Sequence, residues 1–370
     1  MKVAIIHDWL NQYGGAELVL EALKELFPDA PIYTSIYHPK AMPDFYRRWD
    51  IRTSFMDKLP FVKTHHQLFL VFYPLAFESF NLSGYDLVIS NKSGFCHGII
   101  TSPETVHICY CLTPTRFVWD FHEYIQGEAI GPMVRKLLPP FIFFLRQWDK
   151  LAADRVDFFI AISREVKERI RKFYRRASEI LHPPVYTSRF YISPEQEDYY
   201  LVVSRLVPYK RIDIAVEAFN LLKRPLIVVG EGRARPSLEK KAGPTIRFLG
   251  RVSGEELAQL YARCKALIFP GREDFGIAPL EAQASGRPVI AYAAGGALET
   301  IVEGKTGLFF HSQTPEALAE AVLEFERRAA DFDPAAIRRN AERFDVKNFR
   351  NKMWLFVRFA LDFIKGGAYV

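Results

Sequence analysis

The sequence predicts an α/β protein built from two doubly wound parallel-sheet domains. Three observations support this prediction. Short apolar runs alternate with helix-like stretches through most of the chain, which is the pattern of repeated strand–helix units. The alternation lapses once, near residues 181–198, and then restarts. At 370 residues, the chain is also longer than one hydrophobic core usually serves.

In the first half, four short apolar runs predict buried strands: KVAIIH, YDLVISN, VHICYC and DFFIAIS. The first run is followed by a loop with two glycines and by the helical pattern AELVLEALKELF. A longer helical stretch, PPFIFFLRQWDKLAADRV, precedes the last run. Because strands and helices alternate, we expect one parallel sheet with helices on its faces.

The segment LHPPVYTSRFYISPEQED is rich in proline, serine and acidic residues and predicts the linker between the domains. After it, the strands YYLVVSRL, PLIVVG, TIRFLG, ALIFPG and PVIAY predict a second Rossmann-like sheet. Ser253 with Glu256 three residues later predicts a capping box. We place the first domain at residues 1–185 and the second at 186–346. The apolar face of the tail helix, about 347–370, predicts that this helix packs back on the first domain.

Composition and charge exclude several classes of protein. The chain is 49% hydrophobic and 25% charged, which is typical of globular proteins and not of disordered ones. It contains no run of 18 apolar residues, and its first apolar run is too short for a signal peptide, so no membrane span or leader is expected. The four cysteines lack CxxC spacing, which predicts buried free thiols in a reducing, cytoplasmic compartment.

Glycine-bearing loops follow four of the predicted strands. Gly14 and Gly15 follow KVAIIH, the GEG sequence follows PLIVV, EDFG follows ALIFP, and AAGG follows PVIAY. In open parallel sheets, ligands bind beyond the carboxyl ends of the strands. Glycine allows close backbone approach there, and helix N-termini offer free N–H groups to an anion. Strand-to-helix turns need glycine in any case, but four such loops together predict a phosphate-bearing ligand.

The segment EDFGIAPLE places two carboxylates, Glu273 and Glu281, around a glycine turn and a helix opened by proline. The N–H groups of Ile277 and Ala278 would then be free to meet a phosphate. Since carboxylates accept paired hydrogen bonds from vicinal hydroxyls, we interpret the pair as a clamp on a phosphorylated, polyhydroxylated molecule. A glycosidase acid/base pair is the alternative for both residues, and a helix-dipole role is the alternative for Glu281.

The stretch SRLVPYKR supplies Arg205 and Lys210 just after a predicted strand. Arg suits bidentate phosphate contacts and Lys a point-charge contact, although two solvated charges on a turn would explain the pattern as well. The absence of GxGxxG and of GxxxxGK[ST] disfavours a nicotinamide dehydrogenase and a P-loop nucleotidase. In the one DxD sequence, Asp333 precedes Pro334 as a helix N-cap would. We therefore expect no metal and no cofactor.

Taken together, these motifs resemble the family-4 retaining glycosyltransferases, whose GT-B fold has two Rossmann-like domains facing a cleft. Glu273 to Glu281 looks like the E-x7-E motif of that family. The resemblance extends over SRLVPYKR, GEG, FLGRVS, the stretch from PGREDFG to KTGLFF, and GGAE near the N-terminus. The CYCLTPTRFVWD region is similar to the subgroup of mannosyltransferases that act in surface polysaccharide assembly.

The resemblance implies a metal-independent enzyme that moves a hexose, with mannose from GDP-mannose as the best guess, to a lipid-linked or polysaccharide acceptor. The first domain would bind the acceptor and the second the sugar nucleotide. Arg205 and Lys210 would hold the donor diphosphate and stabilise the leaving phosphate, Glu281 would bind the ribose, and Glu273 the donor sugar. The other donor-binding positions that it implies are Gly14, Gly15, Gly230, Glu231, Gly250, Arg251, Val252, Phe275, Gly276, Ile277 and Ala278.

The sequence departs from the family at Leu112, where relatives often carry a His that contacts the reacting sugar. In the family, the departing phosphate can take the acceptor's proton, so a strong general base is not required. If one exists, Asp8 and Asp120 are the candidates, and Asp120 could equally be a helix cap. A sugar-nucleotide epimerase of similar build and a non-catalytic sugar-nucleotide-binding protein are the alternative functions.

Two stretches of the first domain combine basic and apolar residues: SFMDKLPFVKTHHQLFLVFYPLAF and SREVKERIRKFYRR. The second has seven basic and two acidic residues. This composition suits an anionic membrane surface on the inner face of the cell membrane. The alternative is an ordinary amphipathic helix with Val166, Ile170 and Phe173 facing the core. No nucleic-acid-binding motif accompanies the charge, so nucleic acid is not expected as a partner.

Overall fold

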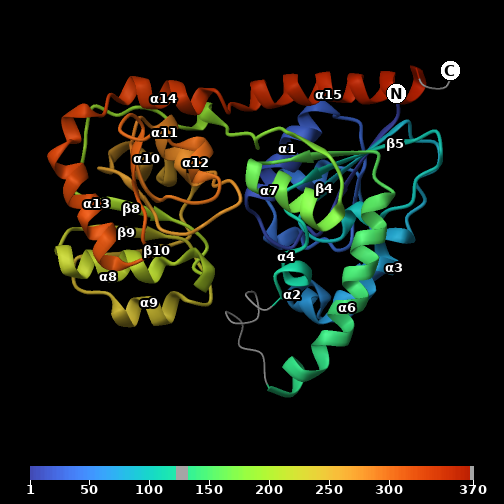
Figure 1. The fold of residues 1–370 in the computed structure, drawn as a ribbon, viewed down its shortest axis with the longest axis horizontal. Coiled ribbons are helices and arrows are strands. Elements are labelled where there is room, and N and C mark those ends of the chain that lie inside the picture. The colour runs from blue at the N-terminus through green and yellow to red at the C-terminus, as the bar shows by residue number, and fades with distance from the viewer. Residues whose placement is uncertain (122–131, 367–370) are drawn as a thin grey trace. The chain divides into compact units, whose positions relative to one another are not determined.

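The computed structural model describes residues 1–121 and 132–366, and the chain divides into two compact units (Figure 1). Unit 1 comprises Met1–His182 and Phe349–Val370, and unit 2 comprises Pro183–Asn348. Each unit contains one parallel sheet with helices around it. The predicted fold class of two doubly wound parallel sheets is therefore confirmed, whereas the cleft between the domains stays a prediction.

The sheet of unit 1 has seven parallel strands in the order β3-β2-β1-β4-β5-β6-β7. Strand order reverses at β1, which pairs with β2 on one side and with β4 on the other. Every residue of β1, β4 and β5 is buried, as expected where helices cover both faces of a sheet. The strands are β1 Val3–His7, β2 Ile32–Thr34, β3 Ile51–Thr53, β4 Leu87–Lys92, β5 Val106–Cys111, β6 Phe158–Ala161 and β7 Ser178–Ile180.

The helices of unit 1 range from single turns to α6, which has 23 residues. They are α1 Gly15–Leu26, α2 Val62–His65, α3 Tyr73–Glu78, α4 Arg116–Trp119, α6 Pro132–Asp154, α7 Arg164–Arg169 and α15 Val346–Gly366. Short helical turns join them, notably η3 Phe55–Lys58, η4 His66–Phe72, η5 Cys96–Gly98 and η6 Ile170–Tyr174.

The basic stretch 163–176 folds as α7 and η6 with its apolar side chains directed inward. Val166, Ile170 and Tyr174 are buried. Phe173, which was predicted to face the core, is half-buried and stacks on Trp119 with a centroid distance of 4.8 Å. The amphipathic-helix interpretation of this stretch is therefore confirmed for two of its three predicted core residues.

The tail helix α15 packs on unit 1 from Phe349 onward. The Phe349 ring lies 5.6 Å from that of Tyr110, and Met353 on the same face is fully buried. Arg350 forms an ion pair of 2.8 Å with Glu25 of α1. These contacts join the last helix of the chain to strands and helices from its beginning.

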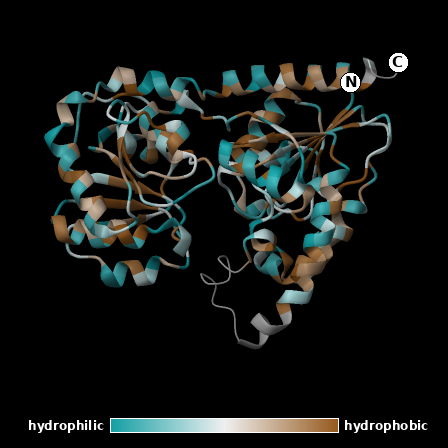
Figure 2. Cartoon of the chain, in the orientation of Figure 1, coloured by the Kyte–Doolittle hydropathy of each residue, from teal (hydrophilic) through white to brown (hydrophobic). Residues whose placement is uncertain are grey.

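The sheet of unit 2 has six parallel strands in the order β10-β9-β8-β11-β12-β13. Its strands are β8 Tyr200–Val203, β9 Leu226–Val229, β10 Ile246–Gly250, β11 Leu267–Phe269, β12 Val289–Tyr292 and β13 Gly307–Phe310. Its helices are α8 Ile212–Leu222, α9 Arg235–Lys241, α10 Gly254–Arg263, α11 Ala278–Ala284, α12 Ala297–Thr300, α13 Pro315–Arg327 and α14 Pro334–Glu342. The strands of both sheets carry the hydrophobic residues that form the cores (Figure 2).

Two predicted helix caps are present in unit 2. Ser253 Oγ accepts a hydrogen bond of 3.1 Å from the N–H of Glu256, which confirms the cap of α10. The side chain of Asp333 accepts hydrogen bonds from the N–H groups of Ala335 and Ala336, at 3.0 and 3.1 Å. The DxD sequence is thus explained by the start of α14 and by an ion pair between Asp331 and Arg328.

Two further observations concern membrane spans and thiols. Among the described residues, no helix is both long and apolar enough to cross a membrane. The four cysteines, Cys96, Cys109, Cys111 and Cys264, are buried and not in disulfides. The prediction of buried free thiols is confirmed.

Candidate functional site

The candidate site of unit 2 lies where strand order changes direction, between β8 and β11. These two strands pair directly in the middle of the sheet. The loop after β8 carries Arg205 and Lys210, and the loop after β11 carries Glu273. Because the carboxyl ends of parallel strands meet at one edge, these loops are neighbours at the position where open α/β sheets bind ligands.

Lys210 and Glu273 form an ion pair in which Nζ lies 2.5 Å from Oε1. Their side chains are 13% and 19% exposed, so water screens the pair little. A Cβ on Gly271 would lie 2.8 Å from the backbone oxygen of Lys210, so glycine is needed where the two loops touch. The structure therefore brings together a cation and a carboxylate that the sequence predicted separately for one ligand.

A third loop, after β12, fixes the backbone of Glu273. The N–H of Gly296 donates to the carbonyl of Glu273 at 2.9 Å. A Cβ on Gly296 would lie 2.2 Å from the Cα of Phe275, so the AAGG loop can approach only because it has no side chain there. The glycines of this loop thus have a structural cause, which is the close contact with the segment EDFG.

Glu281 lies one turn inside α11, the helix that follows Gly276. Gly276 has φ +86°, and Pro279 occupies the first turn of α11, as predicted. The hydroxyl of Tyr261 donates to Glu281 Oε2 at 2.8 Å. Burial raises the pKa of Glu281 above its ordinary value, while the Tyr261 hydrogen bond and the charge of Arg189 partly oppose that rise. A half-buried carboxylate that has one donor partner retains capacity for further donors, such as sugar hydroxyls.

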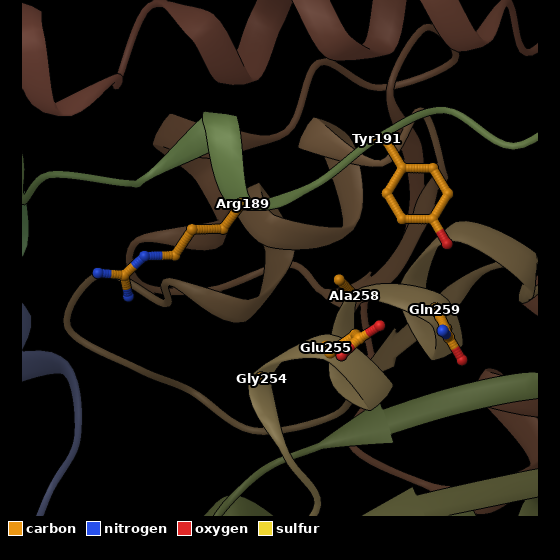
Figure 3. Close-up of a pocket in the computed structure, with 6 residues that line it drawn as sticks. All are labelled: Arg189, Tyr191, Gly254, Glu255, Ala258 and Gln259. Carbon is orange, nitrogen blue, oxygen red and sulfur yellow. The ribbon is translucent and has the colours of Figure 1, made fainter. Parts of the chain in front are cut away.

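A pocket of about 440 Å³ lies beside α10 and is hereafter called the α10 pocket (Figure 3). In Figure 3, Glu255 and Gln259 lie on α10, and the ring of Tyr191, which belongs to the linker segment, lies above them. The side chain of Arg189 extends away to the other side. The helix that lines this pocket also reaches Glu281, because Tyr261 of α10 donates to that carboxylate. It is lined by Arg189, Tyr191, Gly254, Glu255, Ala258 and Gln259.

The GEG loop and Arg205 make contacts within the protein that do not themselves require a phosphate. Gly230 has φ +126°, and a Cβ there would lie 1.9 Å from the carbonyl oxygen of Ser204. The carboxylate of Glu231 forms an ion pair with Arg235. The guanidinium of Arg205 donates to the hydroxyl of Tyr209 at 3.0 Å and is exposed. Packing against the β8 loop therefore explains Gly230, and the side chain of Arg205 is accessible to a ligand.

The remaining positions of the predicted donor site lie close to these residues in the chain. Gly250, with φ +73°, ends β10, and Arg251 and Val252 connect it to the cap of α10. Phe275 is buried beside Gly276. Ile277 is the residue before α11 and Ala278 its first residue. Their binding roles stay predictions.

Asp8, a predicted candidate base, is instead bonded to the turn that follows β4. Its Oδ2 accepts the N–H groups of Ser93 and Gly94, both at 2.6 Å. Its Oδ1 accepts those of Phe95 and Cys96, at 2.6 and 2.8 Å. Because four backbone donors occupy the buried carboxylate, these contacts disfavour Asp8 as a general base and assign it to holding the turn.

The other predicted positions of unit 1 lie near the carboxyl edge of its sheet. Gly14 is the N-cap of α1 and Gly15 its first residue. Leu112 directly follows β5, and its N–H donates to the carbonyl of Lys92 at 2.8 Å. Asp120 directly follows α4 and is half-buried. Its role as a general base or as a helix cap stays a prediction.

The sequence prediction missed a buried polar network beneath Leu112. Lys92, at the end of β4, is fully buried, and its Nζ donates to Thr115 Oγ1 at 3.1 Å and to the carbonyl of Thr113 at 3.3 Å. Asp149 of α6 is also fully buried and bonds Thr115 Oγ1 at 2.9 Å and the Tyr174 hydroxyl at 2.7 Å. A lysine at the end of an apolar run was the signal that could have revealed this network.

Within the ranges 1–121 and 132–366, no cluster of three His, Cys, Asp or Glu side chains could hold a metal ion. The predicted independence from metals and cofactors stays a prediction.

Comparison with known proteins identifies a family that matches most of the second unit and relatives that match about half of the chain. Residues 187–344 match the family described as glycosyl transferases group 1. An uncharacterized glycosyltransferase of Methanocaldococcus jannaschii is 28% identical over 48% of this chain and 52% of its own length. A GDP-mannose-dependent alpha-(1-6)-phosphatidylinositol monomannoside mannosyltransferase of Mycobacterium tuberculosis is 31% identical over 57% of this chain and 60% of its own length. The chain thus spans about half to three fifths of these relatives.

Solved structures are similar over nearly the whole chain. Sucrose-phosphate synthase from Thermosynechococcus elongatus has a TM-score of 0.77 at 18% identity and covers 97% of this chain and 98% of its own. Anabaena HepE in complex with UDP has a TM-score of 0.72 at 17% identity and covers 97% and 100%. At these identities the similarity establishes the fold alone.

The first prediction concerns Asp8→Asn. The amide nitrogen cannot accept hydrogen bonds, so two buried N–H groups lose their acceptor, and we expect the free energy of unfolding to fall by about 3 kcal/mol. Urea unfolding followed by circular dichroism measures this change. Asp44→Asn, at an exposed position, is the control and should leave stability almost unchanged. Unchanged stability of Asp8→Asn together with lost turnover would restore Asp8 as a candidate base.

A second prediction follows from the raised pKa of Glu281. The folded protein binds this proton more tightly than the unfolded chain does, so the group favours folding below its ordinary pKa of 4.5. That contribution is lost as the pH rises through the raised value. Glu281→Gln, which carries no charge, should therefore gain stability relative to the wild type at neutral pH and less at acidic pH. Urea unfolding at both pH values measures the difference.

Glu320→Gln on α13 is the matched control for this experiment, because Glu320 is exposed. Its stability relative to the wild type should not depend on pH. If Glu281→Gln behaved in the same way, the partners of Glu281 would have to compensate fully for its burial.

Proposed function

We propose that the protein is a retaining hexosyltransferase, because residues 187–344 match the family of glycosyl transferases group 1. It would move a hexose, with mannose from GDP-mannose as the preferred donor, to a lipid-linked or polysaccharide acceptor without a metal. The observation that carries the proposal is the Lys210–Glu273 ion pair at the β8/β11 switch point. A sugar nucleotide presents to such a site both a diphosphate anion and vicinal hydroxyls.

The ion pair suggests how the donor is received. Lys210 would contact the diphosphate as a point charge, and Arg205, with its exposed guanidinium, would add a forked contact. When the phosphate pairs with the ammonium of Lys210, the carboxylate of Glu273 loses that partner and can accept hydrogen bonds from the sugar hydroxyls. Glu281 would accept those of the ribose beside Tyr261.

The same residues would promote departure of the diphosphate. Negative charge grows on the phosphate oxygen as the bond to the sugar carbon breaks, and Lys210 stabilises that charge in a largely water-excluded position. The acceptor hydroxyl attacks from the face that the phosphate leaves, and its proton passes to the departing phosphate oxygen. Such a mechanism needs no carboxylate base, which agrees with Asp8 being occupied by backbone donors.

The α10 pocket supports guanine as the donor base. Guanine presents two adjacent donors, N1–H and N2–H, which one carboxylate can accept together, whereas uracil offers a single N–H. Glu255 lines the pocket, and the ring of Tyr191, 46% exposed, is available for stacking. The mannosyltransferase of Mycobacterium tuberculosis is named as GDP-mannose-dependent, and this supports the same choice.

The third prediction tests the donor. Among GDP-mannose, UDP-glucose, UDP-GlcNAc and dTDP-rhamnose, GDP-mannose should raise the melting temperature most. Glu255→Gln should weaken GDP-mannose binding about tenfold, because a good bidentate base contact is worth about 1–3 kcal/mol. Isothermal titration calorimetry measures the affinity, and Glu256→Gln, also exposed on α10, is the control. Stabilisation by none of the four would overturn the transferase proposal, and a preference for a uridine donor would overturn guanine recognition.

The fourth prediction is that Lys210→Ala lowers donor turnover by about a hundredfold or more, because a charge stabilised in the transition state loses its partner. The measurement is release of nucleoside diphosphate from the donor, without and with cell-envelope glycolipid as acceptor. Lys240→Ala, an exposed lysine of α9, is the control and should retain wild-type turnover.

Undetectable release by the wild type, despite donor binding, would favour the non-catalytic sugar-nucleotide-binding alternative. Conversion of the donor into its stereoisomer, with no diphosphate released, would favour the epimerase.

A further inference from the structure

Unit 1 exposes a set of large apolar side chains that its core does not use. They lie on α2, η4 and α3 and on the outer side of α6. Phe61 and Leu68 are the extreme cases, at 77% and 79% exposed. We call this set the α3–α6 patch; its members are Phe61, Leu68, Val71, Phe72, Leu75, Phe141, Phe143, Phe144 and Leu151.

The elements that carry the patch are packed together. On their inner sides, Val62, Tyr73 and Leu145 belong to one hydrophobic core. The indole N–H of Trp148 on α6 donates to Glu78 at the end of α3, at 2.9 Å. Figures 1 and 2 show α2, α3 and α6 gathered at one end of unit 1, with hydrophobic residues along α6. The elements that carry the exposed side chains therefore lie next to one another.

Folding does not account for the patch. In the sequence FIFFL of α6, Ile142 and Leu145 are buried, whereas the three phenylalanines between and before them are exposed. A soluble helix would normally place polar residues at those outer positions. Contiguous apolar exposure of this kind marks an interaction surface.

Charge on and around the patch favours an anionic partner. The elements that carry the patch, residues 55–78 and 132–154, contain six basic residues, Lys58, Lys63, Arg135, Lys136, Arg146 and Lys150, and four acids. Asp57 forms an ion pair with Lys63 at 3.2 Å, and Asp149 is fully buried within its own network. Lys58 is exposed. The other two acids are paired as well, Glu78 with Arg155 at 2.9 Å and Asp154 with Lys150 at 2.6 Å.

We propose that the α3–α6 patch docks on the surface of an anionic lipid bilayer. The phenylalanine and leucine side chains would enter the boundary between headgroups and acyl chains, and the lysines would contact the headgroups. Self-association is disfavoured, because a symmetric dimer would place the same basic residues against each other. The helix of residues 163–176 is not part of this surface, since none of its large apolar side chains is among the strongly exposed ones.

This inference goes beyond the proposed reaction and does not depend on it, because the assay needs no sugar nucleotide. The full chain is sedimented with vesicles of phosphatidylcholine alone or mixed with phosphatidylglycerol. We expect binding to the mixed vesicles that salt weakens. The variant Leu68→Gln/Phe143→Gln/Phe144→Gln should bind them about tenfold or more weakly, since each substitution removes an apolar side chain that would enter the bilayer.

The matched control is Leu355→Gln/Phe359→Gln/Phe363→Gln on α15. These side chains are 63%, 55% and 62% exposed, and they lie on the same unit but outside the patch. The control should retain wild-type binding, and both variants should retain circular dichroism and donor-induced stabilisation. Donor binding and vesicle binding can fail separately, so the two proposals are tested separately.

Three results would overturn the proposal. One is that the wild type binds neither vesicle type or binds both equally well. Another is the same loss of binding in the α15 variant as in the patch variant. The third is a wild-type dimer in gel filtration that the patch variant disrupts without any vesicle binding, which would assign the surface to a second copy of the chain.

Discussion

The ion pair between Lys210 and Glu273 joins the two loops on which the candidate site of unit 2 depends. Removing two charges from water costs free energy that their attraction repays only when the geometry is good. Such a pair is therefore weak evidence for stability, and its value lies in fixing one arrangement of the loops. Gly271 allows the backbones of two loops to touch, and the N–H of Gly296 binds the carbonyl of Glu273. The loops after β8, β11 and β12 are therefore held together before any ligand is bound.

Unit 1 uses the same device at the corresponding edge of its own sheet. The carboxylate of Asp8, at the end of β1, gathers four N–H groups of the turn after β4. Lys92, at the end of β4, and Asp149 meet at the hydroxyl of Thr115 in the loop after β5. In both units, the loops have little regular secondary structure, and charged side chains at the strand ends hold them in place. Polar groups so placed must be fully bonded, which restricts the loops to one conformation.

The sequence predicted what depends on local pattern and missed what depends on distant partners. The longer strands and the caps at Ser253 and Asp333 were predicted correctly because each is encoded by adjacent residues. Strands β2, β3, β7 and β13 were not predicted, because each has only three or four residues and no long apolar run marks it. Lys210 and Glu273 were both predicted, but their contact was not, because it arises from loops more than 60 residues apart. The backbone partners of Asp8 were missed for the same reason, since they follow another strand.

Glu281 shows why a residue can be costly to the fold and still be kept. Its burial raises its pKa, so the charged form is less favourable in the folded protein than in water, and one hydroxyl from Tyr261 only partly compensates. A residue whose sole task was to complement the dipole of α11 would do so more cheaply at an exposed position. A carboxylate that must accept hydrogen bonds from a ligand has to remain partly unsatisfied until the ligand arrives. The incomplete compensation at Glu281 is therefore what a binding role requires.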